Sequence, residues 1–236
     1  MNDLIPIDRA VALSEVRDAP DTLEFRSMAL DARAEVYRSG SGLLLLLDAA
    51  GAMLGAVGEV VPAHVRQLFE PRRLTCELLA DRGAYEVLSQ EYSFERAKIL
   101  RLACDWRPPT NRVDGLLVRP LEPQDGLGHL PAELANEMEP QRIVGEVIAG
   151  FIVGKAVSFA YAGSMTETLA DISIDTLAEY RRSGIGRAIV SALIDGIVAG
   201  GRAPVWGATV DNAASLALAA SLGFTRPAGE LFVHEA

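Results

Sequence analysis

Tyr180-Arg181-Arg182-Ser183-Gly184-Ile185-Gly186-Arg187 is the most informative stretch of this 236-residue sequence. It follows an alternating segment, residues 169–176, and opens an apolar segment in which Ile185, Ile189, Leu193 and Ile197 recur every fourth position. The alternation predicts a strand, and the recurrence predicts a helix that ends at Gly200-Gly201. Glycines let a backbone approach a ligand, and a helix start offers unpaired N–H groups and a positive dipole end. With three nearby arginines, this turn is suited to bind a pyrophosphate.

Other phosphate-binding motifs fit this turn less well. A Walker loop requires Gly-Lys-Ser or Gly-Lys-Thr, which the segment lacks. A dinucleotide-binding fingerprint requires a third glycine near position 189, where Ile189 stands. A tight strand-to-helix turn with solvated arginines stays open as a purely structural interpretation.

The segments around this turn predict an α/β unit over residues 113–236. Residues 116–121 read as a strand, and residues 147–153 and 156–162 as a hairpin joined at Gly154-Lys155. On the strand at 169–176, Asp171, Ser173 and Asp175 share one face. A further strand is expected at 204–210, a helix capped by Asp211-Asn212 at 213–222, and a last strand near 231–234.

The first 112 residues predict a smaller α/β domain of unknown role. Two strands are expected at 43–47 and 52–57, helices near 63–69 and 84–90, and a strand near 98–104. We find no catalytic motif there and no evident internal repeat. The Pro108-Pro109 pair within residues 106–112 marks the expected boundary, because adjacent prolines interrupt both helix and sheet.

The amino-acid composition indicates which classes of ligand the protein can bind. The chain has 22 Lys and Arg against 32 Asp and Glu, a formal net charge of -10. Such a surface disfavours nucleic acid and anionic membrane and attracts cations such as a polyamine or an amino sugar. Cys76 and Cys104 lack metal-ligand spacing, so no metal site is expected. Reduced cysteines and the lack of a signal-peptide pattern predict a cytoplasmic protein.

Three segments resemble the GNAT N-acetyltransferase superfamily. Arg181-x-x-Gly184-x-Gly186 matches its Arg/Gln-x-x-Gly-x-Gly/Ala segment, and residues 118–125 resemble its first strand and turn. The later helix of the family is matched by Asn212, Ser215, Leu218, Leu222, Gly223 and Phe224. The resemblance covers residues 114–236 and implies a mixed, mostly antiparallel sheet. Residues 171–177, together with Pro204-Val205-Trp206 and Asn212-x-x-Ser215, more weakly resemble the zwittermicin-resistance acetyltransferase branch, whose members also carry an additional N-terminal α/β region.

The resemblance implies acetyl-CoA as the acyl donor. Backbone groups of Asp175, Thr176 and Leu177 would pair with the pantetheine arm, and one N–H there would stabilise the thioester oxyanion. The pyrophosphate would be held by the turn and helix start, that is by Arg181, Arg182, Ser183, Gly184, Ile185, Gly186 and Arg187. Asn212 and Ser215 would add contacts to the cofactor.

The resemblance also implies transfer to a primary amine, which must first lose a proton. Asp171 is the nearest match to the base of the family and Glu167 the second, although each also reads as a solvated acid. Ala219 stands where the family often has a tyrosine acid, so Ser215, one turn earlier, is the candidate proton relay. A small-molecule acceptor is expected. Open alternatives are a protein N-terminus or lysine, and a non-catalytic acyl-CoA sensor. A homodimer is compatible with the sequence.

Overall fold

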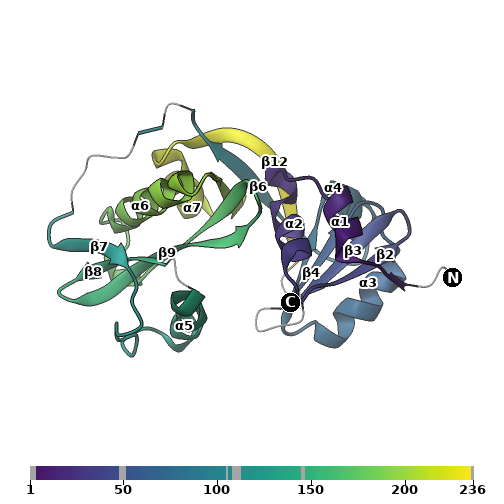
Figure 1. Cartoon of the computed structure of the whole chain (residues 1–236), viewed down its shortest axis with the longest axis horizontal. Helices are drawn as coiled ribbons and strands as arrows, with labels where there is room; N and C mark the ends of the chain where they lie inside the picture. Colours follow the sequence, from purple (N-terminus) through teal and green to yellow (C-terminus); the bar gives the residue numbers. More distant parts are fainter. Residues whose placement is uncertain (1–3, 48–51, 105, 108–112, 145–146, 235–236) are drawn as a thin grey trace.

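A single mixed β-sheet runs through the part of the chain that the computed structural model describes, which is residues 4–47, 52–104, 106–107, 113–144 and 147–234. Its described strands lie in the order β1-β2-β3-β4-β5-β12-β6-β11-β10-β9-β8-β7. Figure 1 shows the sheet as an arch, with β6 and β12 at its centre and the two halves of the chain on either side.

The two halves of the chain repeat the same order of elements, although the second has one helix fewer after its first strand. The first half contains β1 (Ile5–Pro6), α1 (Arg9–Glu15), α2 (Leu23–Leu30), β2 (Glu35–Ser39), β3 (Gly42–Leu47), β4 (Ala52–Val57), α3 (Pro62–Phe69), β5 (Cys76–Ala80), α4 (Arg82–Leu88) and β6 (Glu95–Leu102). The second contains β7 (Leu116–Pro120), α5 (Ala132–Val144), β8 (Ile148–Ile152), β9 (Lys155–Met165), β10 (Leu169–Thr176), α6 (Ile185–Ala199), β11 (Ala203–Thr209), α7 (Ala213–Ser221) and β12 (Phe224–His234).

The last strands of the two halves are exchanged. β6 from the first half pairs with β11, where Leu100 lies opposite Trp206. β12 from the second half pairs with β5, where Phe232 lies opposite Ala80. β6 and β12 also pair with each other at the middle of the sheet. The two halves therefore share one sheet, a repeat of topology that the sequence does not reveal. Residues 108–112 of the expected boundary lie outside the described residues.

Helices cover both faces of the sheet. On one face, α6 and α7 pack Ile189 and Ala219 against Ile172 and Trp206, and α3 and α4 continue this layer over the first half. On the other face, α2 packs Phe25 and α5 packs Met138. The alternation in β10 sorts its side chains accordingly: Ile172 enters the α6 core, and its neighbours on either side face α2 and α5. No helix among the described residues is long and apolar enough to cross a membrane.

The expected elements of the second half are confirmed, with two differences. The hairpin between β8 and β9 turns at Val153-Gly154, both with positive φ, rather than at Gly154-Lys155. β12 begins at Phe224, well before the expected strand near 231–234. Register shifts at Phe224/Arg226 and Pro227/Gly229 allow β12 to contain a proline and still pair.

Candidate active site

A gap opens in the sheet where β10 and β11 stop pairing. These parallel strands are paired from Leu169↔Ala203 to Asp171↔Val205. Beyond this point β10 continues on β9 as far as Thr176, whereas β11 continues on β6. In the first half the matching strands, β4 and β5, stay paired over their whole length. The gap is thus a feature of the second half.

Asp171 lies at the start of this gap. Its carboxylate accepts hydrogen bonds from the backbone N–H groups of Gly207 and Ile172. Gly163 and Gly207 lie beside the carboxylate: a Cβ on Gly163 would lie 3.8 Å from it and one on Gly207 3.7 Å, both ordinary contacts, whereas a Cβ on Gly163 would clash with Ser173 Oγ at 2.7 Å. Counted from the first parallel pair, Leu54 occupies the matching position of the first half and is buried in the core.

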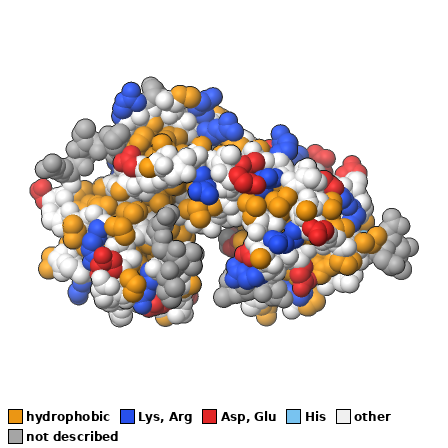
Figure 2. All heavy atoms as spheres, in the orientation of Figure 1, with side chains coloured by type: hydrophobic (Ala, Val, Ile, Leu, Met, Phe, Trp, Pro, Cys, Tyr) orange, Lys and Arg blue, Asp and Glu red, His pale blue; other side chains and the backbone are white. Residues whose placement is uncertain are grey.

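A cavity of about 660 Å³ lies beneath the gap on the α2 and α5 side. Figure 2 shows the molecule hollowed between its two halves. The cavity is lined by strands from both halves, by the α2 end and by α5. The charged side chains among its described lining residues are all acidic, namely Asp21, Glu24, Glu77, Glu137 and Asp171. A cavity of one sign concentrates ligands of the opposite charge.

Two of these carboxyls hold their protons more tightly than free carboxyls do. Burial raises the pKa of Asp171 well above its usual range, and repulsion by Glu24 adds to the rise, against the two amides that lower it. Burial likewise raises the pKa of Glu24, while the Ser164 hydroxyl donates to it at 2.5 Å and Glu77 repels it. A carboxylate with a raised pKa is a stronger base than an ordinary one.

Tyr161 forms part of the cavity wall. Its hydroxyl donates a hydrogen bond to Glu137 of α5. Burial, followed by the hydrogen bond to Glu137 and then its negative charge, raises the pKa of Tyr161, so that the phenol stays protonated at neutral pH.

The glycine turn has the geometry of an anion site. Gly184, the residue before α6, has a φ of +87°, and no side chain caps the helix. The first bond of the helix runs from Ala188 N–H to the Gly184 carbonyl at 3.1 Å, so the N–H groups of Ile185, Gly186 and Arg187 have no acceptor within the helix. A Cβ on Gly186 would lie 3.6 Å from Thr176 Oγ1, which shows how close α6 approaches the end of β10.

The arginines of the turn do not all point toward it. Arg181 Nε donates to the Thr176 carbonyl at 3.0 Å, at the end of β10. Arg182 is exposed and has a positive φ of 60°. Arg187 donates to the Ser221 carbonyl at 2.7 Å, at the end of α7, so its side chain turns away from the expected phosphate site and its backbone N–H stays there. Ser183 donates to the Tyr180 carbonyl at 2.5 Å and keeps the turn tight.

The end of β10 is partly engaged with β9. The Ser158 hydroxyl donates to the Asp175 carbonyl at 2.9 Å and lies 2.6 Å from Thr176 Oγ1. Leu177 N–H donates to the Val157 carbonyl at 3.0 Å, so this amide is not available for the pantetheine arm expected from the sequence. Burial and Glu137 raise the pKa of Asp175.

Asn212 and Ser215 lie at the start of α7. Asn212 caps this helix by accepting Ser215 N–H at 3.0 Å, and it also lines the cavity. Ser215 Oγ accepts the indole N–H of Trp206 at 3.0 Å, which ties it to the core. Ala219 is fully buried. The structure therefore brings Asn212 to the cavity but does not place Ser215 on its wall.

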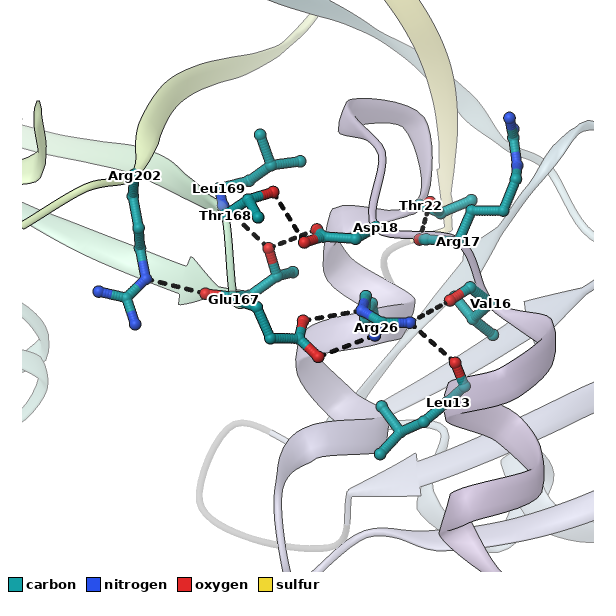
Figure 3. A network of polar contacts seen from close by, with 11 residues as sticks. Leu13, Val16, Arg17, Asp18, Thr22, Arg26, Glu167, Thr168, Leu169 and Arg202 are labelled. Atoms are coloured by element: carbon teal, nitrogen blue, oxygen red, sulfur yellow. Dashed lines mark hydrogen bonds and ion pairs between the residues drawn. The ribbon is translucent and has the colours of Figure 1, made fainter.

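Glu167 is held by an ion pair outside the cavity. Both of its oxygens accept hydrogen bonds from Arg26 of α2 at 2.8 Å, and Figure 3 shows this pair beside the turn between β9 and β10. The Arg26 bond lowers the pKa of Glu167 to about 2. A carboxylate with so low a pKa is a poor base at neutral pH. This geometry gives Glu167 a structural role and corrects the expectation that it is the second candidate base.

Sequence reasoning missed Glu24, Tyr161 and Glu137. Glu24 and Glu137 lie on helices that were not predicted, and Tyr161 lies within an apolar strand. A signal for Tyr161 was present in the alternation of β9, which places it on the same face as the acids of β10. No spacing in the sequence links Glu24 to Asp171.

Comparison with known proteins agrees with the geometry. Residues 144–228 match the family model for GNAT acetyltransferase. This segment belongs to the GNAT superfamily. The whole chain has the fold of solved GNAT structures: a GCN5-related N-acetyltransferase-like protein from Streptococcus suis aligns over 96% of this chain and 98% of its own at 15% identity, with a TM-score of 0.70.

Two further structures show the same fold over the whole chain. A GCN5-related N-acetyltransferase from Kribbella flavida aligns over 97% of this chain and 95% of its own, at 13% identity and a TM-score of 0.61. A tandem GNAT protein from the clavulanic acid biosynthesis pathway aligns over 99% and 98%, at 16% identity and a TM-score of 0.61. A search of curated proteins gave no match. The GNAT fold thus accounts for both halves of this chain.

Proposed function

We propose that this GNAT protein transfers the acetyl group of acetyl-CoA to a primary amine of a small molecule. The observation that carries the proposal is the position of Asp171, where the gap between β10 and β11 meets the acidic cavity. The gap joins the α6 start, suited to an acyl-CoA phosphate, to a cavity suited to a cation.

The second half has the groups that a bound acyl-CoA requires. The three free N–H groups at the α6 start can hold a pyrophosphate, with Arg181 and Arg182 nearby. The edge of β10 beyond Asp171 has no β11 partner, so its backbone groups can pair with an extended arm. The first half lacks these features: β4 and β5 leave no gap, and Gly58-Glu59-Val60-Val61 replaces the arginine-bearing turn. We therefore propose one acyl-CoA site per chain.

Asp171 would act as the base. Its carboxylate takes a proton from the ammonium group, and the neutral nitrogen then attacks the thioester carbonyl carbon. The C–S bond breaks, the nitrogen loses its second proton to solvent as it becomes the amide, and CoA leaves as a thiolate that takes a proton back from solvent. A thiol with a pKa of about 8.5 needs little help to leave. Protonation by water is consistent with a site that has no side-chain acid at these two positions, because Ala219 is buried and Ser215 is bonded to Trp206.

The buried Ala219 favours one alternative, a sensor that binds acyl-CoA without catalysis. Release of free thiol from acetyl-CoA, measured across a panel of small amines and lysine peptides, separates the candidates. The proposal predicts amine-dependent release that is faster with small amines than with peptides. Binding of acetyl-CoA by calorimetry without thiol release for any amine would identify a sensor, and release with peptides alone would identify a protein acetyltransferase.

A further inference from the structure

The described wall of the cavity carries acidic side chains and no basic ones, and one of these acids, Asp21, is paired at 3.6 Å with Arg17 from outside the wall. The described lining residues include five acids and no lysine, arginine or histidine, in a chain with 22 lysines and arginines. Carboxylates that are withdrawn from water are normally paired with an opposite charge or take up a proton. A cationic ligand in the cavity would supply the positive charge that its described wall lacks.

Asp171 and Glu24 show this most clearly, because they approach from opposite halves of the chain. Asp171 is bonded to backbone amides of β10 and β11, and Glu24 of α2 to the hydroxyl of Ser164. Each side chain is partly buried at the cavity wall, burial raises the pKa of each, and the charge of Glu24 raises the pKa of Asp171 further. Neither has a cationic partner among the described residues with which it is bonded.

The nearest arginine on the same helix is engaged elsewhere. Arg26, two positions after Glu24, gives its guanidinium to both oxygens of Glu167 and to the carbonyls of Leu13 and Val16. Figure 3 shows this group directed toward α1 and the β9–β10 turn. Its hydrogen bonds hold it in that position, so it is not positioned to neutralise Glu24.

One ammonium group cannot satisfy both carboxyls through the reaction. The nitrogen that is acetylated gives up its positive charge, and Asp171 takes the proton. Glu24 would then face the product without a counter-charge from the ligand. A second ammonium group on the acceptor solves this, because it keeps its charge throughout.

We propose that the acceptor is a dication, a diamine or polyamine. Its reacting nitrogen lies at Asp171, and its second ammonium group lies at Glu24 on the wall contributed by the first half. This inference rests on the proposed function for the role of Asp171, and it assigns to the first half the selection of the acceptor.

Calorimetry on the full chain tests the inference without requiring turnover. The probes are 1,4-diaminobutane and n-butylamine, which have the same carbon chain and differ in the second amine. We expect the diamine to bind at least about tenfold more tightly, the gain of one well-placed charged group. Glu24→Gln should lower diamine affinity about tenfold and change n-butylamine affinity less than about twofold. Glu86→Gln, the same charge change on an exposed face of α4, should change neither.

Equal binding of the two probes by the wild type would overturn the inference, as would a Glu24→Gln variant that keeps wild-type diamine affinity. Thiol release with the same two amines separates this from failure of the proposed function. Acetylation of both amines at equal efficiency, independent of Glu24, would support the proposed acetyltransferase activity and overturn the proposed dication site. Selective diamine binding without thiol release would support the dication site and overturn the proposed acetyltransferase activity.

Discussion

The carboxylate of Asp171 accepts the backbone N–H of Gly207 at the point where β10 and β11 separate. The Asp171 side chain thus bonds a backbone amide of β11 just beyond the last residue of β11 that pairs with β10. The bond holds the carboxylate between the proposed acyl-CoA site and the acidic cavity. It also leaves a partly buried acid close to Glu24, and both consequences can be measured.

Asp171 should reduce the stability of the folded protein at neutral pH. Its pKa in the folded protein lies above its usual 3.8, so folding favours the protonated form. Stability from this group is therefore full below pH 3.8 and is lost as the pH rises through the raised pKa. We expect Asp171→Asn to raise Tm at neutral pH, by about 2 to 4 °C for each kcal/mol gained, and to have little effect near pH 3. Scanning calorimetry at both pH values checks this, and a variant with lower Tm at neutral pH would contradict it.

Gly184→Glu should abolish the stabilisation of the protein by acetyl-CoA. The substitution brings negative charge and bulk to the α6 start, where the free N–H groups lie. Gly184→Ala is the control for backbone strain, because it meets the same positive φ at a cost of about 1 to 2 kcal/mol without the charge. Thermal shift with acetyl-CoA should be lost in the glutamate variant and kept in the alanine variant. Equal ligand-induced shifts in both would show that the phosphate lies elsewhere.

Arg26 should contribute more to stability than its partner Glu167. Arg26→Ala leaves two backbone carbonyls and a carboxylate without their donor, with an expected loss of about 2 to 4 kcal/mol. Glu167 is half exposed, at 48%, so solvent weakens its charge, and Glu167→Gln should cost at most about 1 kcal/mol. Urea unfolding of the two variants at neutral pH measures both values. A larger loss for Glu167→Gln would be inconsistent with this geometry.

The Glu167 contribution should also depend on pH. Its pKa falls from 4.5 to about 2 on folding, so its stabilisation is present above 4.5 and is lost as the pH falls through about 2. Wild type and Glu167→Gln should therefore differ in urea midpoint at pH 7 and converge toward pH 2.

The sequence predicted the second half well because its elements have strong local signals. The four-residue recurrence in α6, the alternation in β10 and the glycine turn between them are each set within a few residues. β12 was predicted too short because Pro227 and Gly229 read as strand breakers, and only its pairing with β6 and β5 overrides them.

The acidic cavity could not be predicted because its parts meet only through tertiary structure. Glu24 lies on α2, whose apolar residues Leu23, Phe25, Met28 and Ala29 do not form a simple helical stripe in sequence. The exchange of β6 and β12 brings α2 over β9 and β10, and this exchange depends on strand pairing far along the chain. The repeat of topology could not be predicted for the same reason. Two strands can occupy equivalent positions without similar sequences, because a strand requires apolar alternation but no particular residues.

The pH dependence of acetyl transfer by wild type and Asp171→Asn tests the central claim most directly. With saturating acetyl-CoA and the best amine of the panel, we expect kcat of the variant to fall at least about tenfold and to respond less to pH, while acetyl-CoA affinity stays close to that of wild type. Glu86→Gln serves as the control for a changed surface charge. An Asp171→Asn enzyme with wild-type kcat between about pH 6 and 9 would show that Asp171 is not the base.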